Sequence, residues 1–406
     1  MKPDQLISRS KLLGIAGLGW MFDALDVGLL SFIMAALKQD WNLSAKALGW
    51  IGSVNSIGMA LGALIFGLLA DRIGRKNVFI ITLLMFSVAS GLSALANTLA
   101  VLMFLRFFIG MGLGGELPVA STLVSESVPA HERGRIVVLL ESFWALGWIL
   151  AALIAYFVIP DYGWRAALLL GALPALYAVY LRFRLPDSPR FLPRAGAQTN
   201  PVKNLTQLFS RPYLRATIML WVLWFSVVFS YYGMFLWLPG MVGLKGFGLM
   251  KSFEYVLIMT LAQLPGYFSA AWLIERYGRK FVLITYLLGT ALSAYFFGNA
   301  DSVAQLLLAG MSLSFFNLGA WGALYAYTPE QYPDAIRATG AGAAAAFGRV
   351  GGIFGPLAVG YLLGARVGVE TIFLVFCAMI AVGIIAVAAL GHETKGIELK
   401  ATGPVN

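Results

Sequence analysis

The stretch Asp71-Arg72-Ile73-Gly74-Arg75-Lys76 returns 204 positions later as Glu275-Arg276-Tyr277-Gly278-Arg279-Lys280. A second motif keeps this offset, its members being Glu126, Pro129, Arg133 and Gly134 and then Glu330, Pro333, Arg337 and Ala338. Two motifs at one offset in a chain of 406 residues indicate an internal duplication of a unit about half its length. In a strongly apolar chain, such a duplication is typical of membrane transporters whose substrate lies between the two halves.

The composition of the chain also indicates a membrane protein. Hydrophobic residues make up 60% of it and charged residues 12%, whereas soluble domains carry about 25% charged residues. Twelve apolar runs are long enough to cross about 30 Å of hydrocarbon. They lie at 12–37, 47–70, 77–97, 100–123, 134–157, 164–184, 214–240, 250–273, 280–299, 302–325, 337–363 and 369–390. We therefore expect an all-α membrane protein of twelve transmembrane helices in two pseudo-symmetric six-helix bundles.

A polar gap separates the first six spans from the last six. It predicts an N-terminal bundle at 1–184, a cytoplasmic linker at 185–213 and a C-terminal bundle at 214–406. We expect the bundles to meet along spans 1, 2, 4 and 5 of the first half and spans 7, 8, 10 and 11 of the second. We also expect the protein to be a monomer.

The positive charges indicate how the chain is oriented. If the N-terminus is cytoplasmic, loops on its side hold 21 Lys and Arg residues and the opposite loops hold 6, while Arg106 and Arg349 lie within spans. The positive-inside rule then places both termini in the cytoplasm, in a multi-pass protein of the plasma membrane. The net charge of +10 thus reflects the positive residues in the cytoplasmic loops. We expect these residues to face anionic membrane lipid and not nucleic acid.

The sequence contains no recognisable catalytic or metal-binding motif. Cys377 is the single cysteine and lies inside the last span, and the two histidines, His131 and His392, lie in expected cytoplasmic segments. No nucleophile and base share a catalytic spacing. We therefore expect no enzyme activity, no metal site and no cofactor.

Several motifs resemble those of one transporter family. Gly67-Leu68-Leu69-Ala70-Asp71-Arg72-Ile73-Gly74-Arg75-Lys76, between spans 2 and 3, resembles the signature loop of the major facilitator superfamily. Its sugar-porter-like branch is suggested by the Glu126 to Arg135 loop, by Pro186-Asp187-Ser188-Pro189-Arg190-Phe191-Leu192 and by Glu393-Thr394-Lys395-Gly396. That branch includes organic cation and anion transporters, synaptic vesicle glycoproteins, and bacterial aromatic-acid and niacin transporters. The resemblance implies the major facilitator fold and secondary transport of a small organic solute.

Two further segments are similar to the bacterial organic-acid members of this branch. They are the glycine-rich stretch from Arg106 to Pro118 in span 4 and the segment from Tyr231 to Pro239 in span 7. The chain departs from the sugar porters because His392 stands where they carry proline before Glu-Thr-Lys-Gly, and because their glutamine-rich site in span 7 is absent. The resemblance therefore does not favour a sugar as substrate.

The duplicated loops place charges at the cytoplasmic ends of spans. Acidic and basic side chains there can bridge to neighbouring helix ends and close this side of the protein. We interpret eight of them as gating residues, namely Asp71, Arg75, Glu126, Arg133, Glu275, Arg279, Glu330 and Arg337. The alternative is that they only determine topology.

Charges inside the spans do not follow the duplication. Five in the first half map to uncharged residues in the second, namely Asp23, Asp26, Arg106, Glu116 and Glu141, and Arg349 maps back to Ala145. A charge inside a span costs at least about 2.5–3.5 kcal/mol on insertion scales, so each indicates a function.

Asp23 and Asp26 lie three residues apart on one face of span 1. Two carboxylates this close in a medium of low dielectric should not both be ionised, so we expect one to hold a proton. Arg106 of span 4 is the nearest cation. Proton symporters of the sugar-porter-like branch place an acid of span 1 against a base of span 4, positions that Asp23 and Arg106 match. The alternative is a permanently charged structural pair.

Two glutamates are further candidates for proton coupling. Glu116 in span 4 lies close to Pro118, where the helix is expected to be irregular. Glu141 lies one to two turns into span 5, so it could be a second proton site or part of the cytoplasmic charge network.

Arg349, at the centre of span 11, cannot lose its proton and needs an anion opposite it. The resemblance to organic anion transporters covers Arg349-Val350-Gly351, Ile353 and Pro356. A substrate carboxylate is the expected partner, and an ion pair with Asp23 or Asp26 across the cavity is the alternative.

Aromatic residues cluster near the middle of the expected cavity helices, at Phe22, Trp144, Trp224, Tyr231, Tyr232 and Trp321. Gln263 and Asn317 add neutral hydrogen-bonding groups. We expect the substrate to bind to Arg349, Tyr231, Tyr232, Trp321, Gln263, Asn317 and Phe22. A flat carboxylated ring such as nicotinate or benzoate would suit this set.

The predicted function is therefore import of a small aromatic or heterocyclic carboxylate together with protons. A facilitative uniporter or exchanger, in which the span 1 acids are structural, is the alternative. A receptor that keeps the transporter fold is a third hypothesis.

Overall fold

The computed structural model describes residues 9–73, 75–127, 133–174, 176–177, 180, 205–333 and 336–395, and every regular element in them is an α-helix. The first half forms α1 (Arg9–Asp40), α2 (Ala45–Ile73), α3 (Arg75–Ser93), α4 (Leu99–Ser127) and α5 (Arg133–Leu170). The second half forms α8 (Arg211–Phe235), α9 (Leu238–Leu244), α10 (Leu249–Leu261), α11 (Gln263–Tyr277), α12 (Arg279–Gly298), α13 (Val303–Glu330), α14 (Arg337–Gly364) and α15 (Val369–Leu390). The predicted linker, 185–213, lies largely outside the described residues, so the domain boundaries stay a prediction.

The described helices account for eleven of the twelve predicted spans and for the first part of span 6. Nine segments of the described chain are long and apolar enough to cross a membrane, and Asn77–Ser93 and Leu99–Gly114 are shorter apolar segments. α5 covers span 5, bends at Gly163, whose φ is 77°, shortly after Pro160, and continues into the first residues of span 6. Proline lacks the N–H that a continuous helix requires. The expected all-α fold of twelve transmembrane helices is confirmed.

Spans 7 and 8 are each interrupted. Span 7 ends α8 at Phe235 and resumes as the short α9, which has Pro239 in its first turn. Span 8 breaks at Ala262 between α10 and α11. Pro265 explains this second break, because it cannot donate to the carbonyl of Leu261 four residues earlier. The break puts Gln263 at the start of α11.

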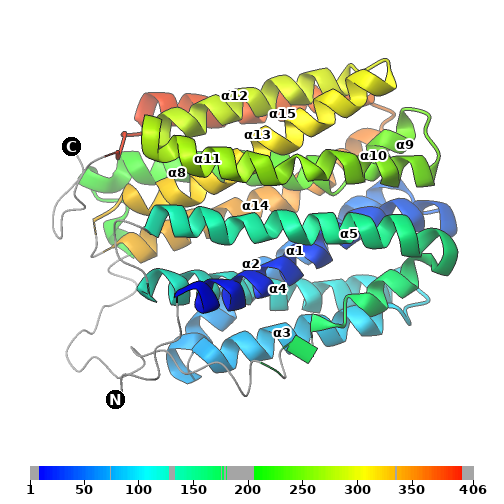
Figure 1. The fold of residues 1–406 in the computed structure, drawn as a ribbon, viewed down its shortest axis with the longest axis horizontal. Coiled ribbons are helices and arrows are strands. Elements are labelled where there is room, and N and C mark those ends of the chain that lie inside the picture. The colour runs from blue at the N-terminus through cyan, green and yellow to red at the C-terminus, as the bar shows by residue number, and fades with distance from the viewer. Residues whose placement is uncertain are drawn as a thin grey trace.

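The helix packing reproduces the duplication seen in the sequence. In the first half α1 packs against α5, and in the second half their counterparts α8 and α14 pack against each other. In the same way, α2 packs against α4 in the first half and α11 packs against α13 in the second. Figure 1 shows α2, α3 and α4 in the lower part of the molecule and α11, α12, α13 and α15 in the upper part. The halves contact each other mainly through α2 against α14 and through α5 against α10, α11 and α13.

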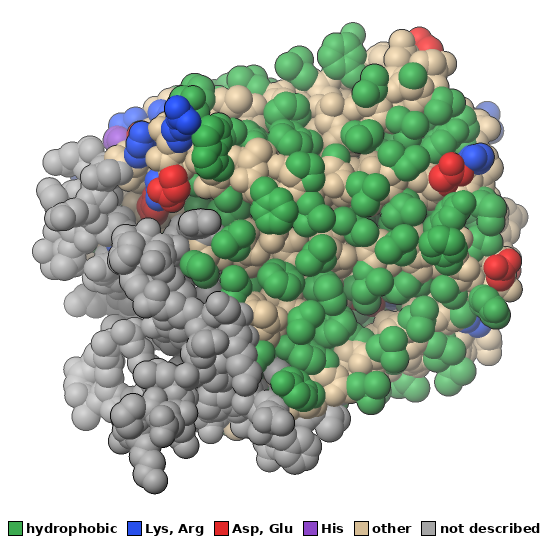
Figure 2. Space-filling model, in the orientation of Figure 1, with side chains coloured by type: hydrophobic (Ala, Val, Ile, Leu, Met, Phe, Trp, Pro, Cys, Tyr) green, Lys and Arg blue, Asp and Glu red, His purple; other side chains and the backbone are tan. Residues whose placement is uncertain are grey.

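α1 begins and α15 ends at the same end of the bundle (Figure 1). We call this end the inner end and the opposite one the outer end. Hydrophobic side chains cover the flank of the molecule between the two ends, and the charged side chains in view gather at the ends (Figure 2). The exposed hydrophobic residues include Leu64, Phe104, Phe157, Leu308 and Ile385. This apolar belt is the surface that a membrane-spanning bundle presents to lipid.

Glycine allows α2 and α4 to pack backbone against backbone. A Cβ on Gly58 would collide with the carbonyl oxygen of Phe107, and one on Gly114 would collide with that of Met59. Glycine spaced at four residues is a known device for such close approach in membranes. The contact holds Met59 at a fixed place in the first half, facing the centre of the molecule.

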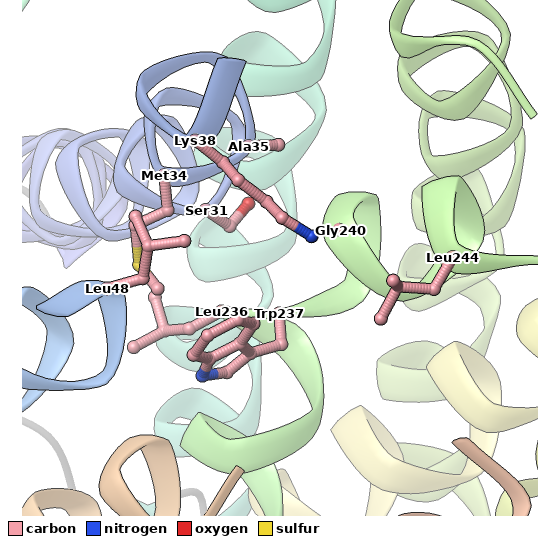
Figure 3. A pocket seen from close by; sticks show the side chains of 9 residues that line it. All are labelled: Ser31, Met34, Ala35, Lys38, Leu48, Leu236, Trp237, Gly240 and Leu244. Atoms are coloured by element: carbon pink, nitrogen blue, oxygen red, sulfur yellow. The ribbon is translucent and has the colours of Figure 1, made fainter. Parts of the chain in front are cut away.

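The two halves are in direct contact at the outer end. Ser53 Oγ donates a hydrogen bond to the backbone oxygen of Ile353 at 2.6 Å. A Cβ on Gly360 would lie 2.6 Å from the carbonyl oxygen of Ala45. Beside this contact, the ends of α1, α2, α8 and α9 surround a small hollow (Figure 3), lined by Ser31, Met34, Ala35, Lys38, Leu48, Leu236, Trp237, Gly240 and Leu244. Helices of the two halves therefore meet directly at this end.

Candidate functional site

Arg349 lies near the middle of α14, where the two halves face each other. Its Nη1 donates a hydrogen bond to the phenolic oxygen of Tyr232 in α8 at 3.1 Å. The same nitrogen lies 3.8 Å from the sulfur of Met59 in α2, and Met59 also accepts from Tyr232 at 3.8 Å. Tyr232 is buried while Arg349 keeps part of its surface exposed. The guanidinium thus retains donors that an anion could reach.

Aromatic rings continue from Tyr232 into both halves. Tyr231 is fully buried, and its hydroxyl accepts a hydrogen bond of 2.6 Å from Nε1 of Trp144 in α5. The ring centroids of Tyr231 and Trp321 are 4.7 Å apart, and those of Tyr231 and Tyr232 are 5.3 Å apart. Trp321 in turn lies 6.3 Å from Trp224. Flat aromatic ligands pack well against such faces. The predicted residues Tyr231, Tyr232 and Trp321 therefore do come together beside Arg349.

Glu141 of α5 belongs to this same cluster. Its Oε2 accepts a hydrogen bond of 3.2 Å from Nε1 of Trp20 in α1, and the carboxyl is only 1% exposed. The Trp20 ring lies 4.7 Å from the ring of Trp144. Glu141 also lies within electrostatic range of Arg349. Of the two interpretations of Glu141, the structure therefore favours a place in the central site over one in the inner-end network.

The two acids of α1 have different surroundings. Asp26 forms a buried ion pair of 3.0 Å with Arg106 of α4 and accepts a hydrogen bond of 3.4 Å from Ser90 of α3. Asp23 instead lies within electrostatic range of Tyr232 and Arg349. The resemblance matches Asp23 with Arg106, and in the described contacts the ion pair of Arg106 is with Asp26. The chain thus separates one closed ion pair from one acid near the central cluster.

Gln263 and Asn317 are the neutral polar residues of the predicted site. Both are buried, Gln263 at the start of α11 and Asn317 in α13. Among the described residues, neither the Gln263 amide nor the Asn317 amide oxygen has a hydrogen-bond partner. Buried amides usually have partners, so these groups could bind a polar ligand. The ring of Phe22 packs edge-on against Tyr177, with 5.5 Å between the ring centroids, so its place in the substrate site stays a prediction.

Charged side chains of the second half form a network at the inner end. Arg279 forms ion pairs of 3.2 Å with both Glu275 and Glu330. Glu330 also accepts a hydrogen bond from Thr394, and Glu393 accepts from the backbone N–H groups at the start of α12. The network ties α11, α12 and α13 to the segment that follows α15. It therefore fixes helix ends within one half of the protein.

Arg337 behaves differently from the other repeated charges of the second half. Its Nε donates to the backbone oxygens of Pro329 and Tyr332.

Five predicted functional residues have side chains outside the described part of the structure. They are the gating residues Asp71, Arg75, Glu126 and Arg133 and the proton site Glu116. Their roles stay predictions.

Sequence reasoning missed several residues of these clusters. Trp20 and Met59 occupy α1 and α2 but carry no charge, and Glu393 and Thr394 were noticed only as a family motif. Position within a predicted cavity helix was the available signal for Trp20. Met59 had no such signal, because a methionine in an apolar span is ordinary. The contacts of Glu393 depend on how the chain returns after α15.

A family model described as Major Facilitator Superfamily matches residues 16–268 and 254–403. The chain belongs to the major facilitator superfamily. The resemblance in its motifs is thereby confirmed. A protein of Bacillus subtilis whose name proposes niacin/nicotinamide transport is 64% identical to it, over 98% of this chain and 100% of that protein. The niacin transporter NiaP of Acinetobacter baylyi is 49% identical, over 97% of this chain and 96% of its own length.

A solved structure of a D-xylose-proton symporter has the same fold. It matches with a TM-score of 0.78 at 20% sequence identity and covers 95% of this chain and 99% of its own. The likeness supports the twelve-helix arrangement of this chain.

Proposed function

We propose that this protein imports nicotinate across the plasma membrane, with protons, by alternating access between its two halves. The substrate carboxylate binds to Arg349 and the pyridine ring packs among Tyr231, Tyr232 and Trp321. Gln263 and Asn317 supply hydrogen bonds to the ring nitrogen or to the carboxylate. Both chain termini face the cytoplasm, and the protein acts as a monomer surrounded by lipid.

The observation that carries this proposal is the position of Arg349. It is a permanent cation at the interface of the halves, bonded only by neutral groups in the contacts described above, Tyr232 and Met59. A guanidinium offers a planar fork of donors that matches a carboxylate. The aromatic rings beside it accept a flat ring on their faces. A small aromatic carboxylate satisfies both features at once.

The names of the similar proteins support the choice of substrate. The Acinetobacter baylyi protein is named for niacin, and the Bacillus subtilis protein for niacin or nicotinamide. Niacin is the pyridine carboxylic acid, and nicotinamide is its neutral amide. The charge of Arg349 favours the acid.

Proton coupling is the part of the proposal that concerns the buried acids. The groups that could carry a proton through the membrane are Asp23, Asp26 with Arg106, Glu116 and Glu141. Asp23 and Glu141 lie near the central cluster. Alternating access would then move substrate and proton together.

The inner-end network of Glu275, Arg279 and Glu330 would hold the second half together and help to set which conformational state of the transporter is favoured.

A facilitative uniporter is the second candidate function. The observation that favours it is the buried ion pair of 3.0 Å between Asp26 and Arg106, which resembles a structural element. In that case, transport would run only down the substrate gradient.

Uptake of labelled nicotinate into proteoliposomes tests the proposal. With an inwardly directed proton gradient, nicotinate should accumulate above its external concentration, and without the gradient it should only equilibrate. Uptake of benzoate and of 4-hydroxybenzoate shows how strongly transport depends on the identity of the ring. Equilibration that ignores the gradient would support the uniporter, and absence of any nicotinate uptake would contradict the proposed function.

A further inference from the structure

Glu141 and Arg349 lie at the two ends of an unbroken series of side chains. Glu141 accepts from Trp20 at 3.2 Å, and the ring of Trp20 lies 4.7 Å from that of Trp144. Trp144 donates to Tyr231 at 2.6 Å. Tyr231 adjoins Tyr232, which accepts from Arg349 at 3.1 Å. The series crosses from α5 of the first half to α14 of the second, through the aromatic cluster.

Among the side chains that the structure describes, few charges face this series. The ionisable groups near Glu141 are Tyr231 of α8, Tyr267 of α11, Tyr325 of α13 and Arg349 of α14, and α1 contributes Asp23 on the side of Tyr232. Phenols are neutral at physiological pH. Within the described part of the site, the fixed charge is therefore set by Arg349, Asp23 and Glu141.

A bound carboxylate changes the charge balance of this site. Arg349 supplies one positive charge, which faces the carboxyl groups of Asp23 and Glu141, and the substrate adds one more negative charge at Arg349. If Glu141 stayed ionised, its negative charge would then be buried beside the neutral indoles of Trp20 and Trp321, and the charge of Arg349 would already be balanced by the substrate carboxylate. An uncompensated charge in such surroundings is strongly unfavourable, and the group takes up a proton instead.

We propose that Glu141 binds a proton when the substrate carboxylate binds to Arg349, so that proton and substrate are held in the same site. This inference rests on the proposed function and specifies how its coupling works. The proton comes from water and forms an O–H bond on the Glu141 carboxylate. The ion pair of Asp26 and Arg106 does not carry this proton, because its charges already compensate each other at 3.0 Å within the first half.

Linkage makes the effect measurable in both directions. If nicotinate binding favours protonated Glu141, protonation of Glu141 strengthens nicotinate binding by the same factor. Above the pH at which Glu141 of the empty protein titrates, nicotinate affinity should fall about tenfold per pH unit, with uptake of about one proton per bound nicotinate. Below that pH, neither effect should appear.

The experiment measures proton uptake during nicotinate binding to the purified full-length protein. Calorimetry in buffers of different protonation enthalpy, at neutral and alkaline pH, gives affinity and proton count together. Glu141→Gln keeps an acceptor for Trp20 but cannot titrate, so it should bind nicotinate with little pH dependence and little proton uptake. Glu254→Gln makes the same chemical change at the outer end of α10 and should match the wild type. Benzoate should give the same uptake as nicotinate, because the carboxylate is what drives it.

Two variants keep the test decisive. Asp23→Asn should retain nicotinate-linked proton uptake, and Trp20→Phe, which removes the hydrogen bond that favours ionised Glu141, should move the fall in affinity to higher pH. If Glu141→Gln took up as many protons on nicotinate binding as the wild type, the inference would be overturned. The same holds if proton uptake were lost only in Asp23→Asn. In either case the proposed function would stand. A wild-type protein that fails to bind nicotinate would contradict both.

Discussion

Nη1 of Arg349 in α14 lies 3.1 Å from the phenolic oxygen of Tyr232 in α8. Both helices belong to the second half, so the arginine is held by its own bundle. From the first half, the sulfur of Met59 lies 3.8 Å from this nitrogen, and Asp23 of α1 lies within electrostatic range of Arg349. A sulfur is a weak acceptor, so this contact can break at little cost when the halves move. The hydrogen bond between Arg349 and Tyr232 thus lies within one half, which is what the proposed anion site requires if access to it is to change.

The orientation of the chain can be tested by chemical labelling. In a protein with Cys377 replaced by serine, a single cysteine at position 280 should react only from the cytoplasm, and one at position 245 only from outside. Position 76 should behave like position 280, because the duplication places both at the same end of their bundles. Labelling of positions 76 and 280 from opposite sides would refute the two-bundle topology.

Asp26→Asn should destabilise the protein. It leaves the guanidinium of Arg106 buried without a counter-charge, and breaking a buried pair in this way costs about 3–5 kcal/mol. Thermal unfolding in detergent would show this as a lower melting temperature, with part of the loss recovered in Asp26→Asn combined with Arg106→Gln. Glu254→Gln, which breaks the exposed pair with Lys251, is the control and should change stability by less than about 1 kcal/mol. An unchanged melting temperature for Asp26→Asn would show that the pair does not hold α1 to α4.

Gly360→Ala should loosen the outer contact between the halves. Its new Cβ would lie 2.6 Å from the Ala45 carbonyl oxygen, so α2 and α14 must separate. A cysteine at position 48, which lines the outer hollow, should then react faster with an impermeant maleimide. Gly342→Ala makes the same change on the same helix where nothing lies within 4 Å and should leave the rate unchanged. Equal rates in both variants would mean that this contact does not close the outer end.

The sequence was sufficient for the fold, because the repeat, the twelve apolar runs and the motif loops all agree on one architecture. It also singled out Arg349, Tyr231, Tyr232 and Trp321 as candidates, because an intramembrane cation of the second half and mid-span aromatics stand out along the chain. It did not determine which acid Arg106 would pair with. Asp23 and Asp26 are three residues apart, and only the rotation of α1 against α4 decides between them.

Other parts of the site depend on packing that spacing along the chain does not encode. Glu141 could be placed in span 5 but not assigned to the inner network or the central cluster until Trp20 was seen to contact it. Met59 reaches Arg349 only because glycines bring α2 close to α4. Phe22 is expected at the site, and its ring packs against Tyr177, a contact that spacing along the chain does not reveal.

The most direct test of the anion site is ligand binding to the wild type and to Arg349→Lys, using nicotinate and nicotinamide. The wild type should bind nicotinate much more tightly than nicotinamide, which keeps the ring and lacks the charge. Arg349→Lys keeps a positive charge and loses the planar fork, and a charged hydrogen bond is worth about 1.5–3 kcal/mol, so its nicotinate affinity should fall roughly 10–100-fold. Arg366→Lys, in an exposed loop at the outer end, should bind like the wild type. Equal wild-type affinity for the two ligands, or normal nicotinate binding by Arg349→Lys, would contradict a carboxylate site at Arg349.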